Sequence, residues 1–194
     1  IEHTFTHTYA SASQYTAYFS SCCRISTLAV GNDTNFYVSA DIDLTGGNTG
    51  GPTTLAPPLM QIPQGAFSYT FPVSDPDGDS ATCSLVTNGS DVPSPPSGLA
   101  VSSSCELTFN GSSFSAGAKY AYQVELTESG SSSTTIFDGM LQIVNGNLPT
   151  CSGSGNFTLS PGQAFSTSFI GSDVDGGSLS ATLINGPSGS YISP

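Results

Sequence analysis

The sequence predicts an all-β protein built from β-sandwich repeats. Three observations predict this fold class: apolar and polar residues alternate along several segments, no window shows helical periodicity, and one long segment recurs about one hundred residues later. The alternation also argues against a disordered chain, which the many Ser, Gly and Pro residues would otherwise suggest.

Strands with one buried face account for the alternation. Residues 36–44 place apolar side chains at every second position: Phe36, Val38, Ala40, Ile42 and Leu44. Residues 120–126 repeat the pattern with Tyr120, Tyr122, Val124 and Leu126. A period of two with one apolar face is typical of antiparallel sheets that pack on a core.

The internal repeat gives the domain size. Residues 67–86 (FSYTFPVSDPDGDSATCSLV) and 165–184 (FSTSFIGSDVDGGSLSATLI) are identical at nine of twenty positions at an offset of 98. Residues 9–19 and 114–124 are also alike, because each has an aromatic residue, a turn of small residues and then a tyrosine. A period of about one hundred residues suits a β-sandwich domain.

These likenesses divide the chain into three parts. Residues 1–50 are expected to be the closing, C-terminal half of one repeat, 51–147 a complete repeat, and 148–194 the opening, N-terminal half of a further repeat. The chain is thus expected to begin and end inside a domain. Residues 45–58, rich in Gly and Pro, are expected to be a linker.

The charge balance excludes two classes of partner. The 194 residues include 14 acidic and two basic side chains, for a formal charge of −12. Phosphate backbones and anionic lipid headgroups would repel this chain, so we expect no nucleic-acid binding. No segment is long and apolar enough for a membrane helix, so we expect no membrane insertion.

Four Asn-x-Ser/Thr sequons predict attached glycans, at Asn32, Asn88, Asn110 and Asn156. Three of them lie among Gly, Ser or Asp, where a turn exposes the acceptor nitrogen. Sugar also supplies hydration that the 8% of charged residues cannot. With five cysteines, the sequons predict a secreted, extracellular glycoprotein.

The cysteines are expected to be structural. Cys83 and Cys105, 22 residues apart, are expected to form a disulfide between neighbouring strands. Adjacent Cys22 and Cys23 are expected to bond to two different partners, because a ring between neighbours is strained. Cys151 is expected to reach one of them or a neighbouring chain. Their spacing does not fit a zinc site.

The acidic segment 75–79 allows two interpretations. Asp75, Asp77 and Asp79 alternate around Pro76 and Gly78, so their carboxylates are candidate ligands of a calcium ion. Alternatively they form an Asp/Gly turn, in which carboxylates accept backbone N–H groups. The second copy keeps Asp173 and Asp175 as calcium candidates but lacks the third carboxylate, which favours the turn. Calcium is the one cofactor these residues suggest.

No residue pattern indicates catalysis, and we expect no enzyme. His3 and His7 lie in a threonine-rich strand, no Gly-x-Ser-x-Gly motif or nucleophilic cysteine context is present, and Trp is absent. A repeated non-catalytic module explains the sequence better.

Three segments resemble known families. "HTYASASQYTAYF" resembles the closing strands of bacterial and algal PKD-type domains. "FPVSDPDGDS" with "PPSGLAVSSSCELTF" resembles the cadherin-like, Ig-fold repeats of large extracellular proteins. "SSCCRIS" is similar to repeats of mastigoneme-type proteins, the glycosylated hairs of algal flagella. The resemblance implies tandem immunoglobulin-like (PKD/cadherin-like) β-sandwich repeats, and a location outside the cell, either secreted or on a cell or flagellar surface.

The expected function is therefore mechanical. We expect a non-catalytic structural subunit of an extracellular glycoprotein fibre, which self-associates into a helical filament. The filament arises either within a longer chain of repeats or by strand donation between successive chains. The alternatives are an adhesin stalk or carbohydrate- or cell-surface-binding module, and an accessory domain of a secreted enzyme.

Overall fold

The computed structural model is all-β, which confirms the predicted fold class. It describes residues 6–89, 91–146, 149–153, 158, 160, 162–173 and 178–181. Two short 3-10 turns, η1 (Thr45–Gly47) and η2 (Gly111–Ser113), are the helical elements among these residues. The chain divides into two compact units, residues 1–145 and 146–194.

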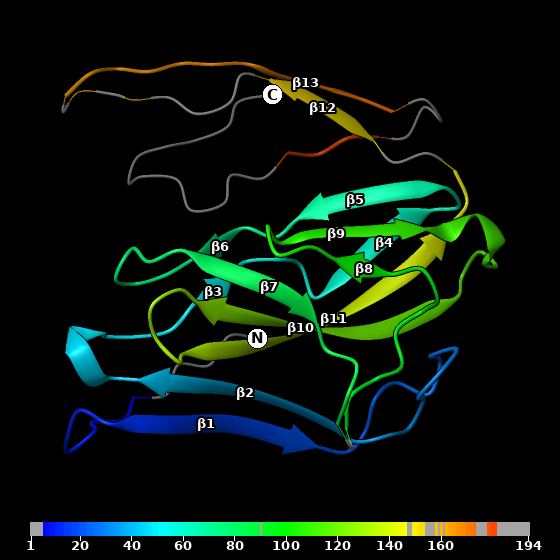
Figure 1. Cartoon of the computed structure of the whole chain (residues 1–194). Coiled ribbons are helices and arrows are strands. Elements are labelled where there is room, and N and C mark those ends of the chain that lie inside the picture. Colours follow the sequence, from blue (N-terminus) through cyan, green and yellow to red (C-terminus); the bar gives the residue numbers. More distant parts are fainter. Residues whose placement is uncertain are drawn as a thin grey trace. The chain divides into compact units, whose positions relative to one another are not determined.

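Residues 51–145 form a sandwich of two sheets (Figure 1). The strands of the first sheet, in spatial order, are β4 (Leu59–Pro63), β11 (Thr134–Val144), β10 (Lys119–Glu128) and β7 (Ala81–Leu85). Those of the second are β5 (Ala66–Thr70), β9 (Glu106–Asn110) and β8 (Ala100–Val101). All neighbours are antiparallel except β4 and β11. This strand order is that of the immunoglobulin fold.

The core lies between these two sheets. Its completely buried side chains alternate along the strands: Ile62, Leu107, Tyr122, Val124, Leu126, Leu141 and Ile143. Burial of each such side chain contributes about 1.5–3 kcal/mol. The alternation predicted for residues 120–126 is confirmed in part: Tyr122, Val124 and Leu126 share a buried face, but Ala121 and Gln123 of the other face are buried as well.

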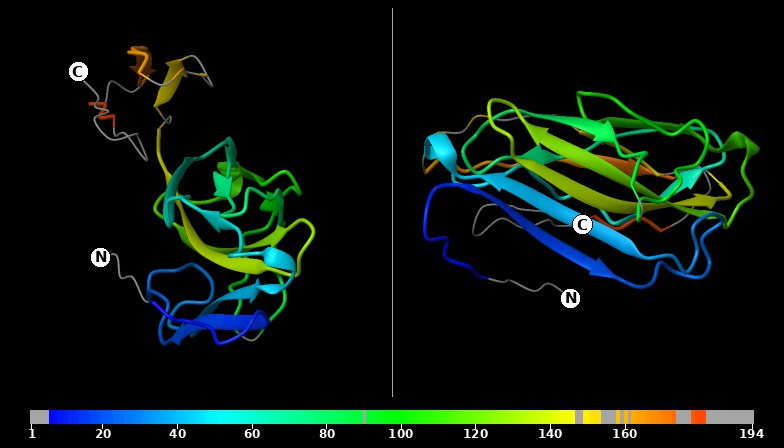
Figure 2. Two further views of the ribbon diagram at one scale, coloured as in Figure 1. Left: turned by 90° about the vertical axis from the view of Figure 1, so that its left-hand side faces the viewer. Right: turned by 60° about the horizontal axis from the view of Figure 1, so that its bottom comes forward.

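A hairpin extends the first sheet. Its strands β1 (Gln14–Ser21) and β2 (Phe36–Asp43) are antiparallel along their whole length, and β2 also pairs with the first residues of β11. Figure 1 and Figure 2 place the hairpin on one side of β10 and β11, and β5, β9 and β8 on the other side.

Arg24, in the loop between β1 and β2, attaches the hairpin to the sandwich. It is 7% exposed and donates to both carboxylate oxygens of Asp138, with Nη1–Oδ1 and Nη2–Oδ2 distances of 3.0 and 2.6 Å. Gln123 Nε2 donates to Asp138 Oδ2 and to the carbonyl of Tyr37. These contacts explain why residues 1–50 and the sandwich form one compact unit.

The segment 45–58 is more ordered than a plain linker. It contains η1 and strand β3 (Thr53–Thr54), which pairs with β6 (Val73–Ser74). Thr53 Oγ1 lies 3.2 Å from Ser74 Oγ and donates to the Ser74 carbonyl.

The second unit repeats this strand pair. Strands β12 (Thr150–Gly153) and β13 (Phe169–Ser172) are antiparallel, with Thr150 opposite Ser172. Thr150 Oγ1 lies 2.8 Å from Ser172 Oγ and donates to the Ser172 carbonyl. Ser172 corresponds to Ser74 at the offset of 98, so both strand pairs place a threonine opposite the equivalent serine.

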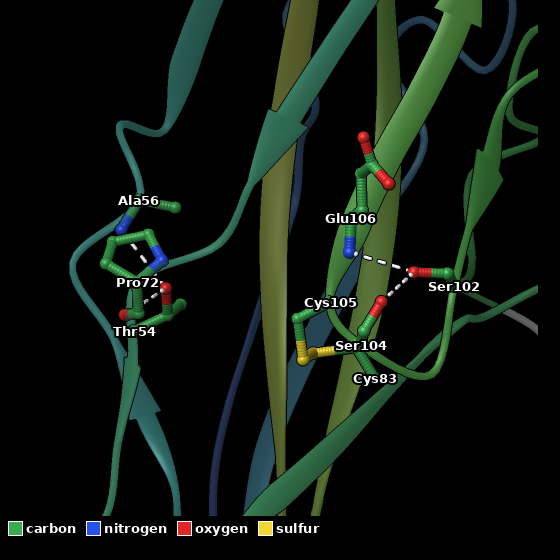
Figure 3. Close-up of a disulfide and its surroundings, with 8 residues drawn as sticks. All are labelled: Thr54, Ala56, Pro72, Cys83, Ser102, Ser104, Cys105 and Glu106. Carbon is green, nitrogen blue, oxygen red and sulfur yellow. Dashed lines mark hydrogen bonds between the residues drawn. A yellow bond between two sulfur atoms is a disulfide. The ribbon is translucent and has the colours of Figure 1, made fainter.

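A disulfide joins Cys83 on β7 to Cys105, the pair expected from the sequence (Figure 3). Their Cα atoms are 4.8 Å apart. Cys105 has a φ of 62° in a tight turn before β9, in which Ser102 Oγ accepts the N–H of Glu106. Close by, Thr54 Oγ1 donates to the Pro72 carbonyl (Figure 3).

The expectation for the adjacent cysteines is corrected. The structure joins Cys22 and Cys23 to each other rather than to two different partners. The peptide bond between them is cis, and their Cα atoms are 3.1 Å apart. Cys151 is exposed and has no disulfide partner among the described residues.

Candidate functional site: the acidic turn and its junction

The segment 75–79 is a turn held by one carboxylate. Asp75 Oδ1 accepts the backbone N–H of Asp77 at 2.8 Å and that of Asp79 at 3.4 Å. Gly78 adopts a φ of 85°, which a side chain would disfavour, and its N–H donates to the Asp75 carbonyl. The geometry is therefore that of an aspartate-capped turn.

Asp77 is bound to a different segment of the chain from the other two carboxylates. Its oxygens accept the N–H and the hydroxyl of Thr49, at 2.8 and 2.6 Å. These hydrogen bonds, the hydroxyl's first, lower the pKa of Asp77 below its usual value, although partial desolvation opposes them. The turn is thus tied to the segment that precedes β3.

Glu128, at the end of β10, takes the place expected for Asp77. One carboxylate oxygen each of Asp75, Asp79 and Glu128 lie within 4.8 Å of one another. Burial and the nearby charge of Glu128 raise the pKa of Asp79. Asp75 Oδ2 is completely buried and has no hydrogen-bond partner among the described residues. Three carboxylates so close favour either a shared proton or a cation with oxygen ligands.

Glu128 is itself fixed by neutral donors. It is 3% exposed, and its Oε2 accepts from Ser131 Oγ and from Asn48 Nδ2, the latter at 2.9 Å. Burial alone would raise the pKa of Glu128, but the hydrogen bonds outweigh it and lower that pKa. Asn48 Nδ2 also donates to Ser133 Oγ. The carboxylate is therefore ionised and held in place at neutral pH.

A similar set of hydrogen bonds fixes the end of the hairpin. Asp43 accepts from the hydroxyl and N–H of Thr45 and from Ser132 Oγ. These bonds, the Thr45 hydroxyl's first, hold the pKa of Asp43 far below its usual range. The backbone N–H of Asp43 donates to Ser133 Oγ. The junction between hairpin and sandwich is thus a network of carboxylates and neutral donors.

The other predicted sites are only partly placed. Asn32, Asn88 and Asn110 are exposed, and Asn156 lies outside the described residues. Asp173 is described, but Asp175 is not, so the second calcium candidate is incomplete. His7 contacts Tyr9 edge to face at 4.7 Å, and His3 lies outside the described residues.

Sequence reasoning missed Glu128. It lies about fifty residues from the acidic turn, and local spacing gave no sign of the contact. The one available signal was its position just after the strand predicted over residues 120–126, since β10 and β7 are neighbours in the sheet.

Comparisons with known proteins give a limited match. Residues 1–45 of the 194 match the family described as integrin beta-like protein A-E, N-terminal. No curated protein sequence matches the chain. Among the described residues, no helix has the length and apolar character needed to cross a bilayer.

Two solved structures are similar at low TM-score. An endo-fucoidan hydrolase from glycoside hydrolase family 107 is 14% identical over 67% of this chain, with a TM-score of 0.32. Extracellular domains 3-5 of Drosophila OTK are 10% identical over 62%, with a TM-score of 0.31. The chain spans 24% and 42% of those two chains.

With its disulfides, the chain is a β-rich module of an extracellular or surface kind.

Proposed function

We propose that the chain is a non-catalytic structural subunit of an extracellular glycoprotein fibre, of the mastigoneme or surface-filament kind. The observation that carries the proposal is the repeated strand pair: β12 and β13 reproduce the pairing and hydroxyl contacts of β3 and β6. Sandwich modules placed in series form a rod, as a fibre requires.

The use of the acidic side chains supports a structural role. Asp77 binds Thr49, Asp43 binds Thr45, and Asp138 binds Arg24. Each carboxylate is engaged by a donor of the chain itself, which stiffens the junction between hairpin and sandwich. A catalytic carboxylate instead faces a substrate in a cleft.

Attached glycans and self-association complete the proposal. Asn32, Asn88 and Asn110 are exposed, so a glycosyltransferase can reach them before or after folding. Glycans keep a chain with few charges soluble and shield it from proteases. The subunits associate with one another, and the fibre needs no cofactor, although calcium suits the acidic turn.

One observation favours the alternative of a binding module in an adhesin. Tyr18 on β1 and Tyr37 on β2 stack on each other, with ring centroids 5.7 Å apart, and are 68% and 37% exposed. Exposed aromatic rings beside hydroxyl groups are suited to stacking on sugar rings.

Electron microscopy of the glycosylated full chain tests the proposal. A fibre subunit gives uniform thin filaments without added ligand, and the Tyr18→Ser variant gives the same filaments. Compact particles that bind immobilised glycans saturably, and lose this binding in Tyr18→Ser, would establish the adhesin alternative instead.

A further inference from the structure

The outer face of the second sheet carries a shallow depression beside one of the predicted glycan sites. Strands β5 and β9 are neighbours in this sheet (Figure 1), with Ala66 opposite Asn110 and Ser68 opposite Thr108. Residues that lie opposite each other on antiparallel strands share a face of the sheet, and these four side chains are all exposed. They therefore form one patch on the side of the sheet that faces away from the core.

The depression exists because its outward side chains are small. It has a volume of about 470 Å³ and is lined by residues 66–68, 98 and 108–110. Phe67 and Phe109 pack with the core on the inner side of the sheet, so they do not fill the depression from outside. Gly98, just before β8, has open space where a side chain would lie. The surface is therefore hollow next to Asn110.

The lining offers the groups that bind a sugar. The hydroxyls of Ser68 and Thr108 have no hydrogen-bond partner among the described residues, so both can donate to a ligand and accept from it. Ala66 presents a methyl group, and no residue of the lining is charged. A neutral surface with two hydroxyls and a small apolar group suits a sugar ring, which itself alternates hydroxyl and CH groups.

Asn110 lies at one end of this depression, and its amide nitrogen is free. Its Oδ1 accepts the N–H of Ser112 at 3.1 Å, which holds the amide group against the turn η2. Its Nδ2, the atom to which an N-linked glycan is attached, has no partner among the described residues. The pair of Ser68 and Thr108 lies two residues further along the strands, about 7 Å away, within reach of the first sugars of a glycan on this nitrogen.

The other two sequons within the described residues lie elsewhere. Asn32 and Asn88 are exposed outside the strands, and neither lines the depression. They provide an internal comparison, because their glycans are attached to the same chain but not beside this lining.

We propose that the glycan of Asn110 lies back on the outer face of β5 and β9, where its first sugars occupy the depression and bind Ser68 and Thr108. The proposal rests on the glycoprotein character of the proposed fibre subunit and gives one of its glycans a fixed position. The bound sugar covers this face of the sandwich, so neighbouring subunits associate through other surfaces of the chain.

Removal of this one glycan is the first test, on the full chain secreted with oligomannose glycans from a eukaryotic host. Ser112→Ala removes the sequon but keeps the N–H that Asn110 Oδ1 accepts, and intact mass shows the loss of one glycan. We expect its Tm to be about 2–4 °C below that of the wild type, the shift that one net hydrogen bond gives in a chain of this size. Asn88→Gln, which removes a glycan from an exposed loop, is the control and should leave the Tm nearly unchanged.

Variants of the lining test where the glycan lies. In the Ser68→Ala/Thr108→Ala chain, the further change Ser112→Ala is expected to lower the Tm by much less than in the wild type, because the sugar has lost its two partners. Each difference is taken within one background, so the effect of the alanines on the fold cancels. Thr70→Ala is the matched control, because Thr70 is exposed on the same face of β5 but does not line the depression. The full difference is expected in that background.

Digestion of the native chain gives a second readout. An endoglycosidase that cuts between the first two sugars is expected to act several-fold more slowly at Asn110 than at Asn88, and equally at both after denaturation. Mass spectrometry of the glycopeptides measures the two rates. Ser68→Ala/Thr108→Ala should remove the protection at Asn110, whereas Thr70→Ala should keep it.

The outcomes separate the position of this glycan from the fibre function. An Asn110 that carries no glycan overturns the proposal, and so does a Tm that falls as far in Asn88→Gln as in Ser112→Ala. Equal digestion at Asn110 and Asn88, or protection that survives the loss of both hydroxyls, also overturns it. Electron microscopy of the wild type tests the fibre independently: chains that form no filaments but show the expected Tm and digestion differences would overturn the fibre and leave the glycan in its place.

Discussion

Asp77 accepts two hydrogen bonds from Thr49, one from its backbone N–H at 2.8 Å and one from its hydroxyl at 2.6 Å. The pair ties the acidic turn after β6 to the segment before β3, about 28 residues earlier in the chain. The two hydrogen bonds favour the ionised carboxylate, which is why the pKa of Asp77 is lowered.

The first prediction concerns the pH dependence of this contact. Because the pKa of Asp77 is lower in the folded state, ionised Asp77 stabilises the fold above its unfolded pKa, and this stabilisation is lost as the pH falls through the folded value. Asp77→Asn should therefore have a lower Tm than the wild type at pH 7, and the difference should narrow below about pH 4.

Calorimetry between pH 7 and pH 3 measures this. Asp33→Asn is the matched control, because it removes the same charge from an exposed loop at a φ of 54° that asparagine tolerates. If the Tm of Asp77→Asn differed from that of the wild type by the same amount at every pH, the role given to Thr49 would be contradicted.

The acidic turn shows what sequence could predict at this site and what it could not. The turn itself follows from Asp75, Gly78 and their spacing, which are local. The separation of Asp77 from Asp75 and Asp79 does not, because it depends on Thr49 in a segment expected to be a linker. Glu128 enters through the pairing of β7 with β10, a contact between distant residues.

The sequence predicted more of the fold than of the candidate site. Alternation identified Tyr122, Val124 and Leu126 as core residues, because a strand has a period of two, but it did not predict that Ala121 and Gln123 of the other face are also buried. The attachment of the hairpin through Arg24 and Asp138 had no local signature. The pairing of Cys22 with Cys23 also differs from the expectation of two separate partners, which rested on the strain of a ring between neighbours.

The second prediction concerns calcium at Asp75, Asp79 and Glu128. We expect calcium to raise the Tm of the wild type and a chelator to reverse the rise, because a cation compensates three adjacent carboxylates. Without calcium, Asp79→Asn should be more stable than the wild type at pH 7. The raised pKa of Asp79 means that its ionised form opposes folding there.

Three variants locate the ligands. Asp79→Asn and Glu128→Gln should lose the calcium response, whereas Asp77→Asn should keep it, because Asp77 faces Thr49. This last result is the reverse of what the sequence suggested. A wild-type Tm that does not respond to millimolar calcium would leave the structural turn as the whole role of the segment.

The third prediction concerns the disulfide of the sandwich. Replacing Cys83 and Cys105 together by alanine should lower the free energy of unfolding by roughly 3 kcal/mol, as expected for opening a loop of this length in the unfolded chain. Urea denaturation measures the loss. Cys151→Ser is the control and should change stability by less than about 0.5 kcal/mol, because Cys151 is exposed. Equal urea midpoints for the Cys83/Cys105 double variant and for Cys151→Ser would show that the disulfide adds no stability.

The fourth prediction concerns the attachment of the hairpin. Arg24→Met should lower the free energy of unfolding by about 2–3 kcal/mol. Removing one partner of a fully buried ion pair costs ~3–5 kcal/mol, but the Asp138 side chain is 23% exposed, so we expect a smaller loss. The double variant Arg24→Met/Asp138→Leu should recover part of the loss, since no unpaired carboxylate remains. Lys119→Met, which removes the other basic residue, is the control. A double variant less stable than Arg24→Met alone would contradict this account.

The fifth prediction separates two roles of Asn110. Its Oδ1 accepts the N–H of Ser112 and caps η2, while its amide nitrogen is the acceptor of the predicted glycan. Asn110→Gln should lose both the glycan and the cap. Its free energy of unfolding should therefore be about 1 kcal/mol lower than that of a variant that loses the glycan alone. Ser112→Ala removes the sequon but keeps the backbone N–H, so it should lose only the glycan.

Intact-mass analysis before and after N-glycan release counts the glycans, and thermal unfolding of the released chains measures the contribution of the cap to stability. An unchanged mass in Ser112→Ala would show that Asn110 is unoccupied, and equal stability of the two released variants would show that the cap contributes nothing.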